Sequence, residues 1–183
     1  MSDASVGYAP ATYTPVARIL HWVTAALVLI MIPIGIAMAN ADLGPIGDTL
    51  YDIHRSTGAL LLPLVIVRLI YRLNNPPPPL PADIPPMQQM AAQATHWALY
   101  GLLIVQALVG WIATSAYRAP IRVFWLFELP PIWPVNQPFS EQAFAVHRFL
   151  GIALVILLCG HIGAALFHHF IRKDDVLKRM IGS

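Results

Sequence analysis

The chain has 183 residues, of which 57% are hydrophobic and only 11% charged, with a formal net charge of +2. In an ordinary soluble domain, roughly a quarter of the residues are charged. The low share of charged residues and the mean hydropathy of +0.64 therefore exclude a soluble globular protein. The nearly balanced charge forms no basic stripe, which argues against a nucleic-acid partner. We therefore expect an integral membrane protein whose main surroundings are the lipid bilayer.

Four apolar segments are long enough to cross a bilayer. The uncharged stretches 19–41, 84–117 and 149–171 each exceed the roughly 20 residues that a spanning helix needs. A fourth segment, about 50–73, carries Arg55 near its start and Arg68 and Arg72 near its end, where long cationic side chains can reach the headgroups. These segments predict an all-α fold, a single membrane domain over residues 1–183 that forms a four-helix bundle with helices at about 15–39, 50–73, 87–116 and 141–172.

The connections between these helices have distinct compositions. The run Pro76–Pro79 cannot continue a helix and should form an extended strap between the second and third helices. The segment 117–140 is rich in aromatic residues and prolines, which is typical of the membrane interface, so we expect it to lie on the outer surface. Ser140 is the predicted N-cap of the last helix.

The distribution of basic residues predicts the orientation. One end of the bundle holds seven basic residues against four at the other: Arg18, Arg68, Arg72, Arg172, Lys173, Lys178 and Arg179 against Arg55, Arg118, Arg122 and Arg148. Because cytoplasmic ends carry the excess of Lys and Arg, both termini are predicted to be cytoplasmic.

Seven histidines in so apolar a chain are the feature that points to chemistry, since ionisable groups are expensive inside a membrane. His147 and His161 are 14 residues apart, so they lie about 21 Å apart along one helix and near one face. The sequences His54-Arg55-Ser56-Thr57-Gly58 and His147-Arg148-Phe149-Leu150-Gly151 share the pattern His-Arg-x-x-Gly. The histidines therefore separate into an outer and an inner level.

Two histidines on facing helices can bind the iron of one haem from both sides. His54 and His147 form the outer pair, while His161 has two possible partners at the inner level, His21 and His96. A porphyrin needs a small residue one turn from each ligand, and the residues in that position are Gly58, Gly151, Ala25 and Ala165, but Tyr100 beside His96. The spacing thus predicts His21 and His161 as inner ligands of a second haem. Cys159 is the only cysteine, so neither haem is bound covalently.

Other interpretations of these residues stay open at this stage. Membrane histidines also form hydrogen bonds between helices, and zinc is a competing metal, although structural zinc needs four ligands at one point. Arg55 and Arg148 fit haem propionates or lipid headgroups equally well. Arg118 and Arg122 could attract a small anion, frame a quinone headgroup, or be plain surface charge. For His168 and His169, interfacial anchoring is favoured over contact with a propionate or a quinone.

Several short motifs together resemble one family. They are Arg18-Ile19-Leu20-His21-Trp22, Ile53-His54-Arg55-Ser56-Thr57-Gly58, Val67-Arg68-Leu69, His96-Trp97-Ala98-Leu99-Tyr100, His147-Arg148, Gly160-His161, His168-His169-Phe170 and Lys173-Asp174. The set is similar to the bacterial cytochrome b561 family of four-helix dihaem proteins of the inner membrane. In the family pattern, the positions of His21 and His161 bind the inner haem, and those of His54 and His147 the outer haem.

The resemblance also implies an activity. It points to an oxidoreductase that links electron transfer to ubiquinone, and for some members to the oxidation of superoxide. The alternative is a haem-binding membrane anchor subunit of a periplasmic dehydrogenase or hydrogenase complex. Neither the motifs nor the spacing identify catalytic residues, the quinone-site residues, the direction of electron flow, the redox potentials or the oligomeric state.

Overall fold

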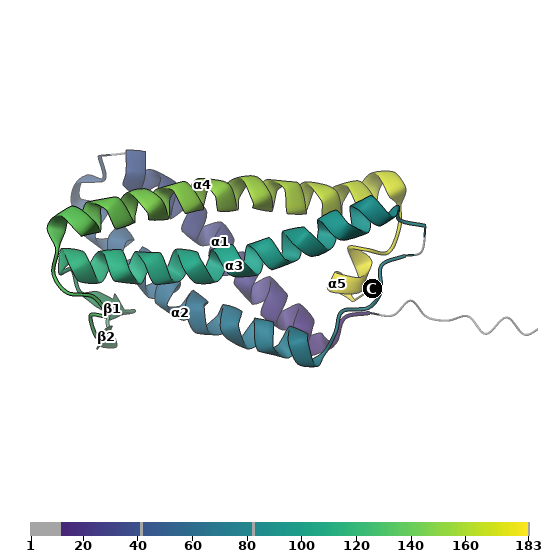
Figure 1. Ribbon diagram of the computed structural model, residues 1–183, viewed down its shortest axis with the longest axis horizontal. Coiled ribbons are helices and arrows are strands. Elements are labelled where there is room, and N and C mark those ends of the chain that lie inside the picture. The colour runs from purple at the N-terminus through teal and green to yellow at the C-terminus, as the bar shows by residue number, and fades with distance from the viewer. Residues whose placement is uncertain (1–11, 41, 82, 183) are drawn as a thin grey trace, which may run out of the picture.

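A computed structural model describes residues 12–40, 42–81 and 83–182. Its four long helices are α1 (Pro15–Asn40), α2 (Gly47–Asn74), α3 (Pro86–Tyr117) and α4 (Gln137–Phe167), which run alongside one another as a bundle (Figure 1). Each forms all or most of a stretch that is long and apolar enough to cross a membrane. The predicted all-α four-helix membrane bundle is confirmed, and the chain is a multi-pass membrane protein.

Helix α2 packs against both α1 and α3, and α3 packs against α4. Helix α4 begins earlier than predicted, and the prediction of Ser140 as its N-cap is wrong. The cap is Asn136, whose Oδ1 accepts a hydrogen bond from the backbone N–H of Phe139 at 3.1 Å. The helix begins earlier because Pro138 fits the first helical turn. Ser140 is instead buried, and its hydroxyl donates to the Ala113 carbonyl on α3 at 3.2 Å.

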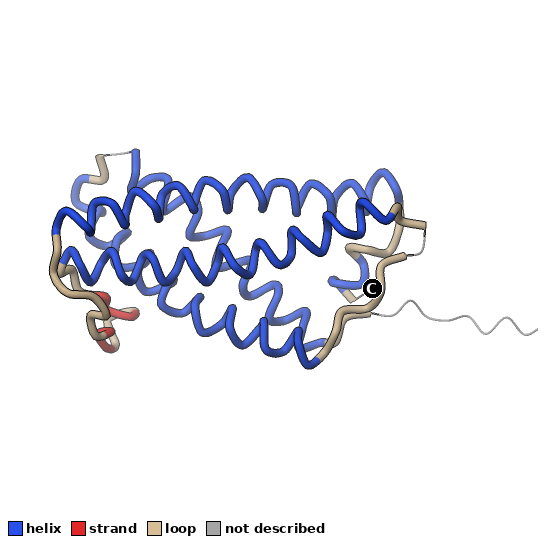
Figure 2. The backbone as a smooth tube through the Cα atoms, in the orientation of Figure 1, coloured by secondary structure: helices blue, strands red, loops and turns tan. Residues whose placement is uncertain are grey.

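The connection between α3 and α4, at the end of the bundle that we call outer, contains a small hairpin that the sequence did not predict. Strands β1 (Ile121–Val123) and β2 (Phe127–Leu129) pair antiparallel at one end of the bundle (Figure 2). Phe124 and Trp125 in the turn have φ of 47° and 60°, a conformation for which hairpins usually use Asn or Gly. The buried hydroxyl of Ser56 stabilises this turn, because it donates to the Arg122 carbonyl at 2.7 Å and accepts from the Phe124 N–H at 2.9 Å.

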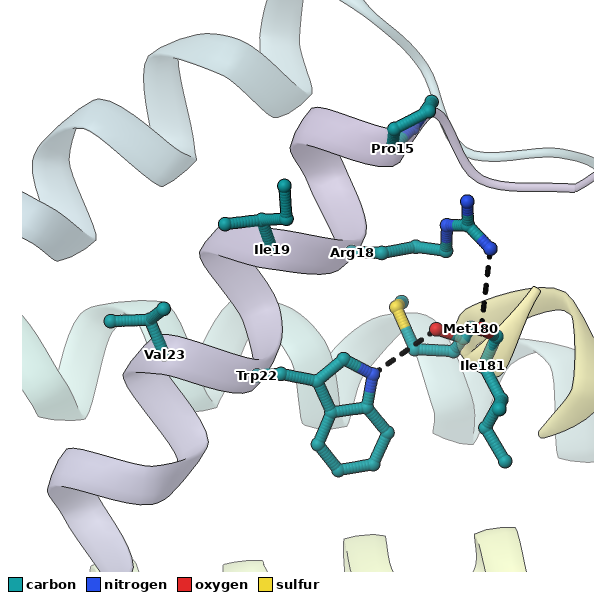
Figure 3. A pocket seen from close by; sticks show the side chains of 7 residues that line it. All are labelled: Pro15, Arg18, Ile19, Trp22, Val23, Met180 and Ile181. Carbon is teal, nitrogen blue, oxygen red and sulfur yellow. Dashed lines mark hydrogen bonds between the residues drawn. The ribbon is translucent and has the colours of Figure 1, made fainter.

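At the opposite end, the C-terminal segment folds back onto α1. It continues from the π-helical turn η2 (His168–Arg172) to the short helix α5 (Lys178–Ile181). The indole N–H of Trp22 donates to the Met180 carbonyl at 3.1 Å and Arg18 Nη1 to the Ile181 carbonyl at 3.2 Å (Figure 3). These bonds satisfy carbonyls that a helix C-terminus leaves free. The two ends of the described chain therefore lie at the same end of the bundle.

A buried apolar layer lies in the middle of the bundle, and we call it the core layer. It consists of one residue from each long helix, namely Val28, Leu61, Leu103 and Leu154, which belong to one buried cluster. Each of these residues lies seven positions after a histidine of the same helix. In the same order, these histidines are His21, His54, His96 and His147. Residues seven apart share a helix face about 10 Å apart along the axis. The core layer therefore lies between the outer and the inner histidines.

Candidate haem sites

The outer level contains one pair of facing histidines. His54 comes from α2 and His147 from α4, with ring centroids 6.2 Å apart and an angle of 79° between the rings. Both side chains are half-buried. The structure thus brings together the two residues that the spacing assigned to the outer haem.

The two outer histidines differ in the surroundings of Nδ1. The Nδ1–H of His147 donates to the backbone carbonyl of Gln106 on α3 at 3.1 Å. In a neutral imidazole this leaves Nε2 with a free lone pair, which is the state of a metal-binding histidine. The Nδ1 of His54 is buried and has no hydrogen-bond partner among the residues that the structure describes. A Cβ placed on Gly35 of α1 would be 3.3 Å from Cε1 of the same ring.

The inner level holds three histidines. The ring centroid of His161 on α4 is 6.3 Å from that of His21 on α1 and 5.4 Å from that of His96 on α3. The structure therefore brings together His21 and His161 as expected, but places His96 beside them.

Cationic and aromatic side chains surround this inner group. Arg68 Nη2 donates to Nδ1 of His21 at 2.7 Å. The guanidinium of Arg68 lies over the buried ring of Tyr100 at 5.2 Å, and that of Arg72 lies over the same ring at 5.8 Å. Tyr100 and the two guanidinium groups thus fill the face of α3 one turn from His96. This is the position where the large side chain of Tyr100 is predicted to leave no room for a porphyrin.

The donor sets fit a metal held between two histidines. Within residues 12–40, 42–81 and 83–182, no group of three or more His, Cys, Asp or Glu side chains is placed to hold a metal ion. An imidazole nitrogen binds a metal ion at about 2.0–2.1 Å, so ring centroids near 6 Å apart can accommodate one ion between two nitrogens. The pairs therefore suit six-coordinate haem iron, whose remaining ligands come from the porphyrin, better than tetrahedral zinc.

The glycines predicted to flank the outer haem do not have equivalent surroundings. A Cβ on Gly58 would meet only the tip of Met31, at 3.6 Å. A Cβ on Gly151 would be 3.3 Å from the amide nitrogen of Gln106. Gly58 thus faces a flexible side chain, whereas the surface beside Gly151 is already covered by a neighbouring side chain.

The four arginines at the outer end differ in their surroundings. Arg55 Nη1 donates to the Pro120 carbonyl at 3.4 Å and lies 3.8 Å from an Asp52 oxygen, so this guanidinium is directed to the outer connection. Arg122 stands opposite Glu128 in the hairpin, which weakens the expected attraction of an anion. Arg118 and Arg148 are exposed.

His168 binds the C-terminal segment rather than the histidines of the inner level. Its Nδ1–H donates to the Asp174 carboxylate at 2.5 Å, and Arg172 Nε lies 3.3 Å from the same oxygen. Burial acts to raise the pKa of the Asp174 carboxyl, but the hydrogen bonds from His168 and from the Val176 N–H, with the charges of His168 and Arg172, outweigh it and lower the pKa. These bonds tie η2 to the C-terminal segment, and the anchoring of His168 and His169 at the membrane interface stays a prediction.

Comparison with known proteins identifies the family. The family description "Prokaryotic cytochrome b561" matches residues 12–183. The chain belongs to the prokaryotic cytochrome b561 family. It is a membrane electron-transfer protein of this family, whose members bind haem b.

Three relatives of the cytochrome b561 family are similar over most of their length. Cytochrome b561 homolog 2 of Escherichia coli K12 is 36% identical over 178 residues, which cover 94% of this chain and 93% of that protein. Cytochrome b561 homolog 1 of the same organism is 31% identical over 166 residues, covering 88% and 92%. A protein of Yersinia pestis named probable superoxide oxidase CybB is 28% identical over 167 residues, covering 88% and 91%.

The sequence did not predict the residues that contact the histidine rings on the side away from the expected metal. Gln106 and Gly110 contact His147, Gly35 lies beside His54, and Arg68 donates to His21. One signal was available for Gln106, because it is a polar residue inside the uncharged stretch 84–117 and such residues tend to bond to neighbouring helices.

Proposed function

We propose that this protein is a dihaem cytochrome b that carries electrons across the membrane between an outer donor and the ubiquinone pool. The observation that carries the proposal is the presence of facing histidines at two levels of one bundle, with the apolar core layer between them. Bound haem b would supply reversible one-electron chemistry at each level. Both termini are proposed to lie in the cytoplasm and the bundle in the bacterial inner membrane.

His54 and His147 are the proposed axial ligands of the outer haem. Their rings face each other from α2 and α4, and the hydrogen bond from His147 to the Gln106 carbonyl leaves its Nε2 lone pair free. A metal-bound His54 would carry a proton on Nδ1, and this buried nitrogen has no hydrogen-bond partner among the residues that the structure describes.

His21 and His161 are the proposed axial ligands of the inner haem, and His96 is not. Ala25 and Ala165 lie one turn from the proposed ligands, whereas Tyr100 lies one turn from His96 and is buried beneath Arg68. A flat macrocycle has room beside alanine and none beside a packed tyrosine. Binding a metal through Nε2 requires a proton on Nδ1 of His21, so Arg68 must release this nitrogen when the inner haem binds.

Superoxide is the proposed outer donor. Two superoxide anions would give up one electron each and leave as dioxygen, while one ubiquinone takes up two electrons and two protons to form ubiquinol. The exposed Arg118 and Arg148 at the outer end favour the approach of a small anion, and the relative named a superoxide oxidase supports this donor. Arg122 contributes less because Glu128 stands opposite it.

Two measurements on the purified chain test this function. A pyridine haemochrome assay is expected to find close to two haem b per chain, and a folded chain without haem would overturn the proposal. Controlled addition of superoxide with a short-chain ubiquinone should then give ubiquinol in the protein's presence. A chain that retains two haems but turns over only with a co-purifying soluble subunit would support the membrane-anchor alternative.

A further inference from the structure

At the outer level, one residue of α3 forms two hydrogen bonds with His147 of α4. The Gln106 carbonyl accepts the Nδ1–H of the His147 ring at 3.1 Å, and the Gln106 side-chain amide donates to the His147 backbone carbonyl at 3.0 Å. The first bond orients the ring and the second fixes the backbone that carries it. Both bonds link neighbouring helices within the span, where such polar contacts have few competitors.

Two glycines make this double contact possible. A Cβ on Gly110, one turn after Gln106 on α3, would be 3.0 Å from Cε1 and 3.2 Å from Nδ1 of His147. On α4, a Cβ on Gly151 would be 3.3 Å from the amide nitrogen of Gln106. The missing side chain of Gly110 lets the imidazole reach a backbone carbonyl, and that of Gly151 lets the amide reach across to α4.

We infer that Gln106 and Gly110 are positioning residues for His147 as a metal ligand. The hydrogen bond fixes the proton on Nδ1 and presents Nε2, and it increases electron donation from the imidazole. Loss of such a partner typically costs 10–100-fold in metal affinity or activity. The inference rests on the proposed function, since it assumes that His147 binds the outer haem.

The main test is Gly110→Ala, with Gly101→Ala as the matched control on the same helix, because a Cβ on Gly101 meets nothing within 4 Å. The readout is a spectroelectrochemical titration of both haems, with His147→Ala supplying the potential of the inner haem alone. We expect Gly110→Ala to favour the ferrous outer haem about tenfold, a rise of about 59 mV for one electron. The inner haem and the control should not change, and an unchanged outer haem in Gly110→Ala would overturn the inference.

A second measurement does not depend on how Gly110→Ala folds. Reduced six-coordinate haem is diamagnetic, so the wild-type holoprotein with ¹⁵N-labelled histidine can be observed after reduction with dithionite. The Nδ1–H correlation of His147, identified by its loss in His147→Ala, should exchange in D₂O more slowly than that of a free imidazole, because the Gln106 carbonyl accepts this proton in a partly buried contact. Its exchange as fast as that of a free imidazole would contradict the proposed hydrogen bond.

The Gln106 side chain is tested separately by Gln106→Leu, which removes the amide and keeps the backbone carbonyl. We expect the outer haem to transfer to apomyoglobin about tenfold faster than in the wild type, while the inner haem transfers at the wild-type rate. Equal rates would overturn the role of this side chain. A wild-type protein without an outer haem would refute the proposed function itself, whereas two haems with no effect of these variants would refute only this inference.

Discussion

The outer and the inner histidine levels are built differently. At the outer level, His147 donates to a neutral backbone carbonyl, and one pair of rings faces across the bundle. At the inner level, three rings crowd together and an arginine donates to Nδ1 of His21. A backbone carbonyl prepares an imidazole for metal binding, whereas an arginine competes for its lone pair. His147 at the outer level is thus preorganised for metal binding, whereas His21 at the inner level must first lose its hydrogen bond from Arg68.

The largest expected effect separates the two levels completely. His54→Ala or His147→Ala should remove the outer haem and leave the inner one, because the core layer lies between them. The haem content per chain, by pyridine haemochrome, should fall from two to one. Loss of both haems from a protein that keeps its helical circular dichroism would contradict the separation into two levels.

A second experiment decides between the crowded inner histidines. His21→Ala should lose the inner haem, while His96→Ala should keep two haems per chain, because Tyr100 fills the face beside His96. The haem content of both variants, measured side by side, checks this. One haem in His96→Ala and two in His21→Ala would reverse the assignment.

A third change tests the influence of the inner arginine. Arg68→Leu removes a cation that contacts His21, and a nearby positive charge favours the ferrous state by electrostatics. The potential of the inner haem should fall by about 59 mV, a tenfold change in the ratio of reduced to oxidised haem. The outer haem serves as the internal reference, and a shift of both potentials together would argue against a local effect.

A smaller effect is expected at the outer hairpin. Ser56→Ala removes the hydroxyl that bonds to Arg122 and Phe124, so the turn with positive φ loses its support. Each hydrogen bond contributes about 0.5–1.5 kcal/mol, and both of these bonds are partly buried. Hydrogen exchange at Phe124 should become faster while the haem content stays at its wild-type value. Unchanged exchange would show that the hairpin is held by other contacts.

The smallest effect concerns the pH dependence of the C-terminal segment. The folded pKa of Asp174 is lowered, so its contribution to stability is complete above the unfolded pKa, about 3.9, and is lost as the pH falls through the folded value. We expect this segment to stay attached at neutral and mildly acidic pH and to detach only in stronger acid. Asp174→Asn should lose this dependence, as limited proteolysis between pH 3 and 7 would measure.

The sequence predicted the features that depend on composition and on helical spacing. Three uncharged stretches and one apolar segment with arginines near its ends located the four long helices. The spacing also matched His54 with His147 and His21 with His161, whose ring centroids lie 6.2 and 6.3 Å apart, although His96 lies nearer to His161 than His21 does. The features that it missed depend on contacts between distant segments. The hairpin needs Ser56 to support two aromatic residues with positive φ, and the surroundings of His147 need glycines on two helices.

The core layer has one further consequence under the proposal of a haem at each level. Its four aliphatic side chains, Val28, Leu61, Leu103 and Leu154, are at most 7% exposed and offer no group that could carry a proton. An electron can tunnel through such a layer, whereas these four side chains provide no path for a proton. Under the two-haem proposal, each transfer between the levels moves an uncompensated charge through part of the membrane's electric field, which amounts to about 2.3 kcal/mol per 100 mV for a full crossing. The turnover of this protein in sealed vesicles would then respond to the membrane potential.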